Sequence, residues 1–322
     1  LAGSIPTEFG LLTDVTEMTL ASNNFEGSIP TELGRMTELL SGTSTADCNA
    51  AFLTSNRLSS TLPSQLGNLK NLTQGLSLHY NSIDSSIPTE LGNLVQLTSC
   101  LSLHSLSLSS SIPSEFGRLT SMEANLYLLS NSLSSALPSE LGNMGMKAAL
   151  EISHNKFNST IPTELGQLSK MTYSFQMQSN SLSSAIPTQL ARMSKMTDYF
   201  RLDSNKLCAD VPTQVEALRT VYGVTNWLVS TGNDLGTACC ETLPGTHTCV
   251  PTSLPTLLPT LACPDGTAWD AASWSCISCS AGKYSNTSSG GKYNSSIMAG
   301  MVPTCTLCPA GRYNVASGQG SC

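Results

Sequence analysis

The chain repeats an aliphatic residue followed by proline at a nearly constant interval. Successive pairs are 24, 33, 25, 25, 25, 24, 25 and 25 residues apart. A period in the twenties, with leucines at fixed offsets, is typical of a solenoid in which each repeat contributes one short strand. No such repeat buries its own apolar face, so we expect stability to come from stacking neighbours. The pairs are Ile5-Pro6, Ile29-Pro30, Leu62-Pro63, Ile87-Pro88, Ile112-Pro113, Leu137-Pro138, Ile161-Pro162, Ile186-Pro187 and Val211-Pro212.

Within a repeat, two leucines alternate with polar residues ahead of an asparagine. In one full copy, Leu76 and Leu78 precede Asn81. The alternation predicts a strand whose leucines enter the core while the residue between them faces outward. We expect the asparagine amides to bond backbone groups of their own and adjacent repeats, so that stacked copies form a ladder. The ladder positions are Asn23, Asn56, Asn81, Asn131, Asn155, Asn180 and Asn205.

Three departures interrupt this regularity. The 33-residue spacing carries an insert around residues 41–50, and Leu106 occupies a ladder position, which predicts one broken rung. Most repeats have an extra residue just before the strand, as in Thr73-Gln74-Gly75 ahead of Leu76. We expect a small bulge at that point.

The full pattern, L-x-L-x-x-N-x-L-x-(G/S)-x-I-P-x-x-L-G-x-L, resembles the plant-type extracellular leucine-rich repeat over about residues 1–249. The wording SIPTELG at 28–34 and 86–92 is similar to algal and protist members. That family includes ectodomains of plant receptor-like kinases and the polygalacturonase-inhibiting proteins. The resemblance implies a leucine-rich-repeat solenoid with a parallel β-sheet on its concave face and short 3-10 or turn segments on its convex side. Serine replaces the usual glycine after the ladder in most copies.

The chain is expected to contain four parts. Repeats cover 1–207, a C-terminal cap covers 208–249, a Pro/Thr-rich linker covers 250–262, and a cysteine-rich module covers 263–322. Four cysteines of the second part resemble the disulfide-stapled cap of the family, with three possible pairings. They are Cys208, Cys239, Cys240 and Cys249.

The last part repeats C-x-x-C-x-x-G-x-Y and resembles small disulfide-rich modules of ephrin-receptor and tumour-necrosis-factor-receptor-like proteins. Its cysteines are Cys263, Cys276, Cys279, Cys305, Cys308 and Cys322. Sequential pairing is one of fifteen possibilities. A zinc ribbon is the alternative that two C-x-x-C pairs leave open.

Cys48 and Cys100 lie outside both clusters. They fall at comparable repeat positions two repeats apart, which at about 4.8 Å per strand separates them by about 10 Å, beyond disulfide reach. We expect buried free thiols. Pairing with another chain or with a segment outside this sequence is the alternative.

Composition indicates an extracellular or cell-surface protein. Only 11% of residues are charged and the net charge is -7, which argues against nucleic acid or an anionic membrane as partner. Clustered cysteines favour an oxidising compartment. Asn71, Asn158, Asn286 and Asn294 begin N-x-S/T sequons and are candidate N-glycosylation sites. No apolar run reaches the length that spans a bilayer, so we expect a membrane only through an anchor outside this sequence.

No P-loop, HExxH or GxSxG motif occurs, so we expect no enzymatic activity, no cofactor and no metal site. A candidate binding face is formed instead by outward residues of the strands and the residues beside them. They are His79, Tyr80, His104, Tyr127, Glu151, His154, Gln176, Gln178, Arg201 and Asp203. Aromatic and planar polar side chains stack on or hydrogen-bond a peptide or glycan. A solvated sheet surface is the alternative interpretation.

Two functional hypotheses follow. The first is a binding module that recognises a protein, peptide or glycan through the solenoid surface. The second is a structural building block of an extracellular assembly such as a wall, sheath or flagellar appendage. Inhibition of a secreted hydrolase rests only on analogy with the polygalacturonase-inhibiting proteins.

Overall fold

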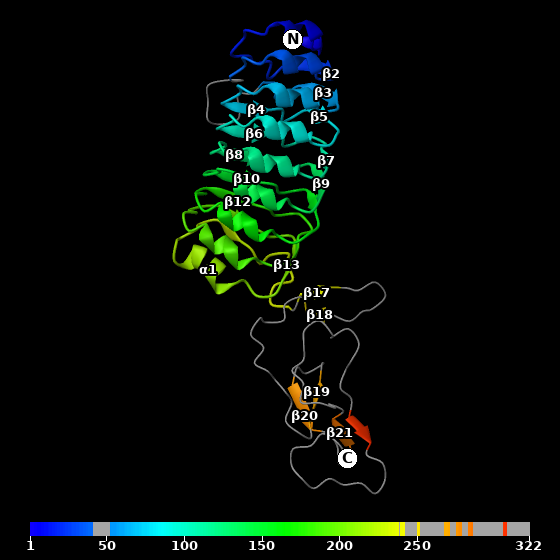
Figure 1. Ribbon diagram of the computed structural model, residues 1–322, viewed down its shortest axis with the longest axis vertical. Helices are drawn as coiled ribbons and strands as arrows, with labels where there is room; N and C mark the ends of the chain where they lie inside the picture. The colour runs from blue at the N-terminus through cyan, green and yellow to red at the C-terminus, as the bar shows by residue number, and fades with distance from the viewer. Residues whose placement is uncertain are drawn as a thin grey trace. The chain divides into compact units, whose positions relative to one another are not determined.

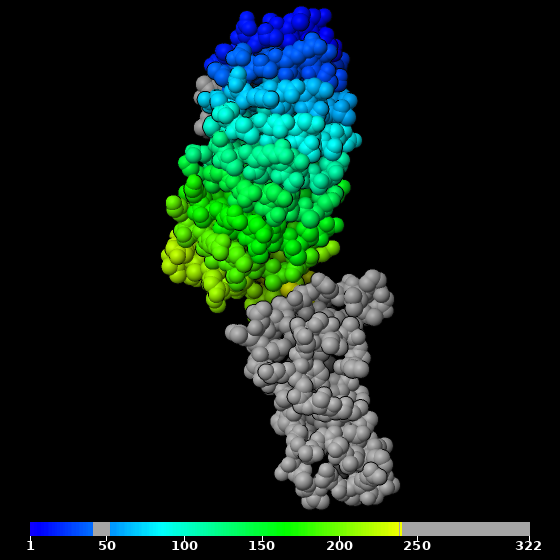
Figure 2. Space-filling model, viewed as in Figure 1, coloured from blue at the N-terminus to red at the C-terminus, as the bar shows by residue number. Residues whose placement is uncertain are grey.

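The computed structural model describes residues 1–40, 52–237, 239–241, 250–251, 267–270, 275–278, 283–285 and 305–307. The chain divides into two compact units, Leu1–Thr252 and Ser253–Cys322. In the first unit the backbone winds through successive coils, which are the coloured bands from blue to yellow in Figure 2. Each coil contributes strands and a short helix to shared layers (Figure 1).

In the described part of the first unit, a concave sheet of parallel strands is formed by the L-x-L segments. Its strands are β4 (Gly75–Ser77), β6 (Cys100–Ser102), β8 (Asn125–Tyr127), β10 (Ala149–Glu151), β12 (Ser174–Gln176), β14 (Phe200–Arg201) and β16 (Trp227–Leu228). Leu76, Leu101 and Leu126 are level with one another and fully buried. The alternation of the sequence thus places one leucine row in the core, where neighbouring coils cover it.

In the concave sheet, the row held by leucine in β4 to β10 is aromatic in β12, β14 and β16. Phe175 stacks on Phe200 with ring centroids 5.3 Å apart, and Phe200 stacks on Trp227 at 4.9 Å. Such ring pairs add to the stabilisation from apolar burial. They fix β12, β14 and β16 relative to one another at the end of the sheet that carries the polar residues described below.

A second series of short strands follows each turn, which the sequence analysis did not predict. The strands are β1 (Ala2–Ser4), β2 (Asn24–Gly27), β3 (Arg57–Ser60), β5 (Ser82–Ile83), β7 (Ser109–Ser110), β9 (Ser132–Ser135), β11 (Lys156–Phe157), β13 (Ser183–Ala185) and β15 (Lys206–Cys208). They pair in parallel within three small sheets of the described residues. Serine is the most frequent residue in these strands, and Ile83 is the single β-branched residue among them, so they largely lack the residues that ordinarily signal a strand.

The convex side is built from 3-10 helices, as the family resemblance implies. They are η1 (Thr7–Leu11), η2 (Thr31–Arg35), η3 (Ser64–Asn68), η4 (Thr89–Asn93), η5 (Ser114–Arg118), η6 (Ser139–Asn143), η7 (Thr163–Gln167) and η8 (Thr188–Arg192). Each begins directly after the repeat's proline, whose fixed φ and missing N–H suit that position. A Cβ on Gly92 of η4 would lie 2.5 Å from Glu115 Cβ in the next coil. The L-G-x-L glycine therefore allows successive helices to approach.

The extra residue of the longer repeats forms a bulge before the strand. The amides of Ser99 and Cys100 both donate to the carbonyl of Gln74, each at 3.1 Å. The amides of Tyr173 and Ser174 share the carbonyl of Ala148 in the same way, at 3.3 and 3.0 Å. Two residues facing one on the neighbouring strand define a β-bulge.

The last coil differs from the others and covers the end of the core. The α-helix α1 (Thr213–Thr220) takes the place of a 3-10 helix and packs against η8. Val215 and Leu218 of α1 are fully buried. A disulfide joins Cys208 to Cys239. These features close the solenoid where its sheet would otherwise end in an open edge.

The remaining described strands pair antiparallel. β17 (Cys240–Glu241) pairs with β18 (Val250–Pro251) in the first unit. In the second unit, β19 (Thr267–Asp270) pairs with β20 (Ser275–Ser278), and β21 (Lys283–Ser285) pairs with β22 (Cys305–Leu307). Within the described ranges, no helix has the length and hydropathy needed to cross a bilayer.

The first unit is a leucine-rich-repeat solenoid, as the sequence predicts. The insert around residues 41–50 lies outside the described residues, as do residues 252–262 of the expected linker and most of the cysteine-rich module.

Candidate functional site

The predicted face falls into two rows across the concave sheet. Tyr127, Glu151, Gln176 and Arg201 are partners in the sheet register and form the first row. Ser77 and Ser102 continue this first row in register toward the N-terminus. The second row consists of residues two positions after Ser77, Ser102, Gln176 and Arg201, namely His79, His104, Gln178 and Asp203. All of these side chains lie on the opposite side of the sheet from the buried leucines.

Tyr80 and His154 occupy a different position, the turn directly after the strand. Their φ angles are 57° and 53°, in the left-handed region. Serine holds this position in the other coils, for example Ser105 and Ser179, with φ of 52° and 56°. Only a few per cent of non-glycine residues adopt such angles. The two bulky exceptions are both exposed at the edge of the concave face.

An aromatic cluster occupies the N-terminal part of this face. The imidazoles of His79 and His104 stack with centroids 4.2 Å apart, and the Tyr80 ring meets both edge-on at 5.1 and 5.3 Å. Tyr127 meets His104 edge-on at 6.1 Å. Tyr80 is 58% exposed whereas His79 is 3% exposed. We call these four residues the aromatic cluster.

A serine that the sequence analysis did not single out organises the two histidines. Ser102 Oγ lies 3.0 Å from His79 Nδ1 and 2.8 Å from His104 Nδ1. The hydroxyl has one proton, so it donates to one imidazole and accepts from the other. The two neutral rings must therefore be in opposite tautomeric states.

Burial keeps both rings uncharged. Desolvation, followed by the charge of His104, lowers the pKa of His79 to about 4. Desolvation also lowers the pKa of His104. A stacked imidazole pair in this setting disfavours adding a proton to either ring. At neutral pH the aromatic cluster is thus an uncharged surface.

A polar cluster occupies the C-terminal part of the face. Ser174 Oγ donates to Glu151 Oε1 at 2.8 Å, and Gln176 Nε2 donates to the same carboxylate oxygen at 3.1 Å. Gln178 Nε2 then donates to Gln176 Oε1 at 2.9 Å. Burial raises the pKa of Glu151, while the hydrogen bonds from Ser174 and Gln176 act in the opposite direction. We call Glu151, Ser174, Gln176 and Gln178 the amide relay.

An ion pair lies on the strand beside the relay. Arg201 donates from Nε and from one terminal nitrogen to the two carboxylate oxygens of Asp203, both at 3.1 Å. This bidentate geometry holds the guanidinium plane in a defined orientation. Arg201 and Asp203 are level with Gln176 and Gln178 respectively, because Met177 and Ser179 donate to the carbonyls of Arg201 and Asp203.

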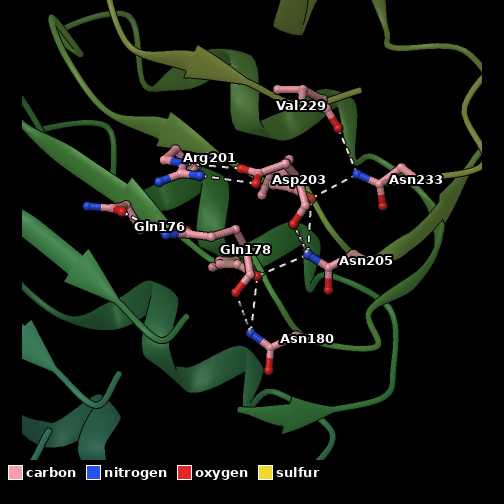
Figure 3. A network of polar contacts seen from close by, with 10 residues as sticks. Gln176, Gln178, Asn180, Arg201, Asp203, Asn205, Val229 and Asn233 are labelled. Carbon is pink, nitrogen blue, oxygen red and sulfur yellow. Dashed lines mark hydrogen bonds and ion pairs between the residues drawn. The ribbon is translucent and has the colours of Figure 1, made fainter. Parts of the chain in front are cut away.

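The asparagine ladder fixes the backbone that carries this cluster (Figure 3). Asn180 Nδ2 donates to the carbonyl of Met177 at 3.1 Å, and Asn205 Nδ2 donates to that of Leu202 at 3.0 Å. Asn233 adds a further rung, with Nδ2 2.7 Å from the carbonyl of Val229. The sequence analysis missed Asn233 because the spacing around it differs from the repeat.

Of the predicted disulfide cysteines and sequon asparagines, the structure describes only some. Cys208 and Cys239 form a disulfide. The side chains of the other predicted disulfide cysteines, Cys240, Cys249, Cys263, Cys276, Cys279, Cys305, Cys308 and Cys322, lie outside the described part of the chain. Sequon residues Asn71 and Asn158 are exposed and lie off the concave strands, whereas Asn286 and Asn294 fall outside the described residues.

The expectation of a free thiol is wrong for Cys100, which is disulfide-bonded. Cys100 is the first residue of β6, and its register partner on β4 is Gly75, which has no side chain. Cys100 is buried, at 2% exposure, as expected, but its thiol is not free. Cys48 lies outside the described residues.

Comparison with known proteins agrees with the fold. No protein-family model and no curated protein sequence matches the chain. Among solved structures, the LRR ectodomain of the plant membrane receptor kinase GASSHO1/SCHENGEN3 from Arabidopsis thaliana, in complex with CASPARIAN STRIP INTEGRITY FACTOR 2, is 36% identical. That match covers 72% of this chain and 26% of the ectodomain, with a TM-score of 0.64.

Two further structures bear on the fold. PEPR1–AtPEP1 is 25% identical over 73% of this chain and 34% of that chain, with a TM-score of 0.57. A Leptospira interrogans LRR protein is 24% identical over 72% of this chain and 53% of that chain, with a TM-score of 0.53. The matched region thus spans about a quarter of the GASSHO1/SCHENGEN3 chain and a third of the PEPR1 chain. The chain is a leucine-rich-repeat protein similar in fold to these structures.

Proposed function

We propose that this chain is a non-catalytic recognition module, outside the cell or on its surface, that binds an extended peptide or protein segment along its concave sheet. The observation that carries the proposal is the grouping of side chains on that sheet. Uncharged rings gather at one end of the described face, and a hydrogen-bonded polar cluster gathers at the other. Aromatic residues and arginine are enriched among the residues that dominate binding energies.

Two further observations support it. The GASSHO1/SCHENGEN3 ectodomain was solved with CASPARIAN STRIP INTEGRITY FACTOR 2 bound, and PEPR1 was solved with AtPEP1. The described sequon asparagines, Asn71 and Asn158, lie off the concave strands, so glycans attached there would leave the face open. Cys100 is disulfide-bonded, so it offers no free thiol for cross-linking to another chain in an assembly.

Selection from a library of random 12-residue peptides on the immobilised 322-residue chain tests the proposal. Peptides that bind the wild type should lose affinity at least tenfold toward Arg201→Ala, because the guanidinium lies in the first row. Arg192→Ala is the matched control, since Arg192 is exposed on η8 on the convex side. Equal binding to both variants, or no selected peptide, would refute recognition through the concave sheet.

A further inference from the structure

Two tyrosines that the sequence analysis did not single out meet at the C-terminal part of the concave face. Tyr173 lies directly before β12 and Tyr199 directly before β14. Their rings meet edge-on with centroids 5.5 Å apart. Tyr173 is 48% exposed and Tyr199 is half-buried, so a ligand can reach both rings. We call these two residues the tyrosine pair.

The tyrosine pair lies beside the amide relay. Phe200 is the register partner of Phe175, so Tyr199 is level with Ser174 on the neighbouring strand. The amide of Phe175 donates to the carbonyl of Tyr199 at 2.7 Å, in agreement with this register. Because side chains alternate along a strand and Phe200 is buried, Tyr199 faces the concave side. Its neighbour there, Ser174, donates to Glu151.

Two partly exposed carboxylates flank the tyrosine pair. Asp198 accepts from Thr225 Oγ1 at 2.8 Å and from Asn226 Nδ2, both through Oδ1. Glu151 accepts its hydrogen bonds from the relay through Oε1. Neither Asp198 Oδ2 nor Glu151 Oε2 accepts a hydrogen bond among the described residues. A carboxylate oxygen is a strong acceptor for a charged N–H, so both sites can take a ligand donor.

The hydroxyl of Tyr173 lies close enough to both carboxylates to respond to their charge. Partial desolvation, followed by the neighbouring Tyr199 and the charges of Asp198 and Glu151, raises its pKa. An exposed aromatic pair with negative charge on two sides is complementary to a cation, because the face of an aromatic ring is itself electronegative.

The cations on the adjoining coils already have partners. Arg201 forms its bidentate pair with Asp203, and Lys147 Nζ lies 2.7 Å from a carboxylate oxygen of Glu123. No ion pair among the described residues includes Asp198 or Glu151. The negative charge around the tyrosine pair is therefore left for a cation that the ligand supplies.

We propose that the tyrosine pair, together with Asp198 and Glu151, binds a lysine or arginine side chain of the peptide that lies along the concave sheet. The inference rests on the proposed function and names the side-chain class recognised at the C-terminal part of the face. The rings attract the cation, and the carboxylates accept its N–H groups and offset its charge. A neutral side chain of similar length gains neither interaction.

Removal of charge from the peptide and from the protein gives the first test. The peptides selected on the wild type should share a lysine or arginine, and its replacement by uncharged norleucine or citrulline should weaken wild-type binding about fivefold or more. Asp198→Asn keeps Oδ1 as the acceptor for Thr225 and Asn226 and removes the charge. The same replacement in the peptide should cost this variant about threefold less than it costs the wild type.

Asp210→Asn is the matched control for that test. It makes the same change of charge at an exposed residue between β15 and α1, off the concave strands. Its response to both forms of the peptide should equal that of the wild type. Equal losses for the wild type and Asp198→Asn at every basic position of the peptide would overturn the inference and leave the proposed function intact.

Removal of one ring gives the second test. Tyr173→Leu keeps an apolar side chain at an exposed position, so we expect the fold to be retained. It should weaken binding of the cationic peptide about threefold or more and change binding of the neutral analogue less than about twofold. Tyr222→Leu is the control, since Tyr222 is 50% exposed and follows α1. Equal weakening of both peptides by Tyr173→Leu would overturn the assignment to a cation.

The remaining outcomes separate the two proposals. If the selected peptides depend on Arg201 but share no basic residue, the proposed function stands and the inference is overturned. If no peptide is selected, the proposed function fails and the inference fails with it. If cellohexaose binds the wild type and loses affinity for Tyr173→Leu, the rings stack on a sugar, and the assignment to a cationic side chain is overturned.

Discussion

The Oδ1 atom of Asn131 accepts the main-chain amide of Leu108, one coil earlier, at 3.0 Å. The same side chain donates to the carbonyls of Leu103 and Leu128 at 2.8 and 3.0 Å, so one amide joins two coils. One coil earlier, Leu106 stands in the ladder position and offers the amide of Ile83 no such acceptor. The rung that the sequence predicts to be broken is thus broken by the loss of an acceptor between coils.

Asn131→Leu should therefore destabilise the chain by about 2–4 kcal/mol, because buried backbone groups in two coils lose their partner. Urea unfolding measures the change. Asn143→Leu is the control, since Asn143 is exposed at the end of η6. A loss below about 0.5 kcal/mol for Asn131→Leu would show that the ladder contributes little.

Gly92→Ala should cost about 3 kcal/mol or more, because the added methyl would lie 2.5 Å from both the Cβ and the carbonyl oxygen of Glu115. Ala191 holds the equivalent position in η8, where the next element is α1. Ala191→Gly should accordingly change the free energy of unfolding by about 1 kcal/mol or less. Similar losses at both positions would rule out close approach of the 3-10 helices as the reason for the glycine.

Ser135→Gly should stabilise the chain by about 0.5–1 kcal/mol. Ser135 has φ of 73°, where a side chain is disfavoured and glycine is not. Gly27 holds the corresponding place in β2 with φ of 77°. Ser132→Gly, on the same strand but without a positive φ, should destabilise through added unfolded-state entropy. Thermal unfolding of the two variants should therefore shift in opposite directions, and equal shifts would contradict this explanation.

Stability should fall as the pH drops from about 6.5 toward 4. His79 has a folded pKa of about 4 against an ordinary value of 6.5, so the unfolded chain binds the proton more readily in this window. The contribution of neutral His79 is complete above pH 6.5 and is lost toward pH 4. We expect this loss to be about 1–3 kcal/mol. His79→Gln should flatten the profile between pH 6.5 and 4, whereas substitution of exposed His154 should not.

The sequence predicts most of the fold because the same pattern of apolar, asparagine and proline positions recurs in each repeat. L-x-L, the ladder asparagine and the Ile-Pro pair define the strand, the turn and the start of the 3-10 helix, and stacking then follows from burial. The second series of strands was missed because segments such as Ser132–Ser135 are almost entirely serine. Their pairing depends on neighbouring coils and not on their own propensity.

The candidate site was predictable in position but not in detail. Outward placement of Gln176 and Arg201 follows from strand alternation alone. The bridging role of Ser102 and the relay through Ser174 depend on side-chain distances across neighbouring strands. Serine recurs throughout the chain, so the residue type gave no sign that these two serines contact the face. Likewise, a single cysteine in a repeat says nothing of its partner, and the disulfide of Cys100 was missed.

Hydrogen–deuterium exchange of the chain with and without a selected peptide tests the central claim most directly. If the concave sheet binds the peptide, amides of residues 149–154, 174–179 and 200–204 should gain protection, while those of η7 and η8 should not change. Protection confined to the 3-10 helices or to the second series of strands would contradict the account.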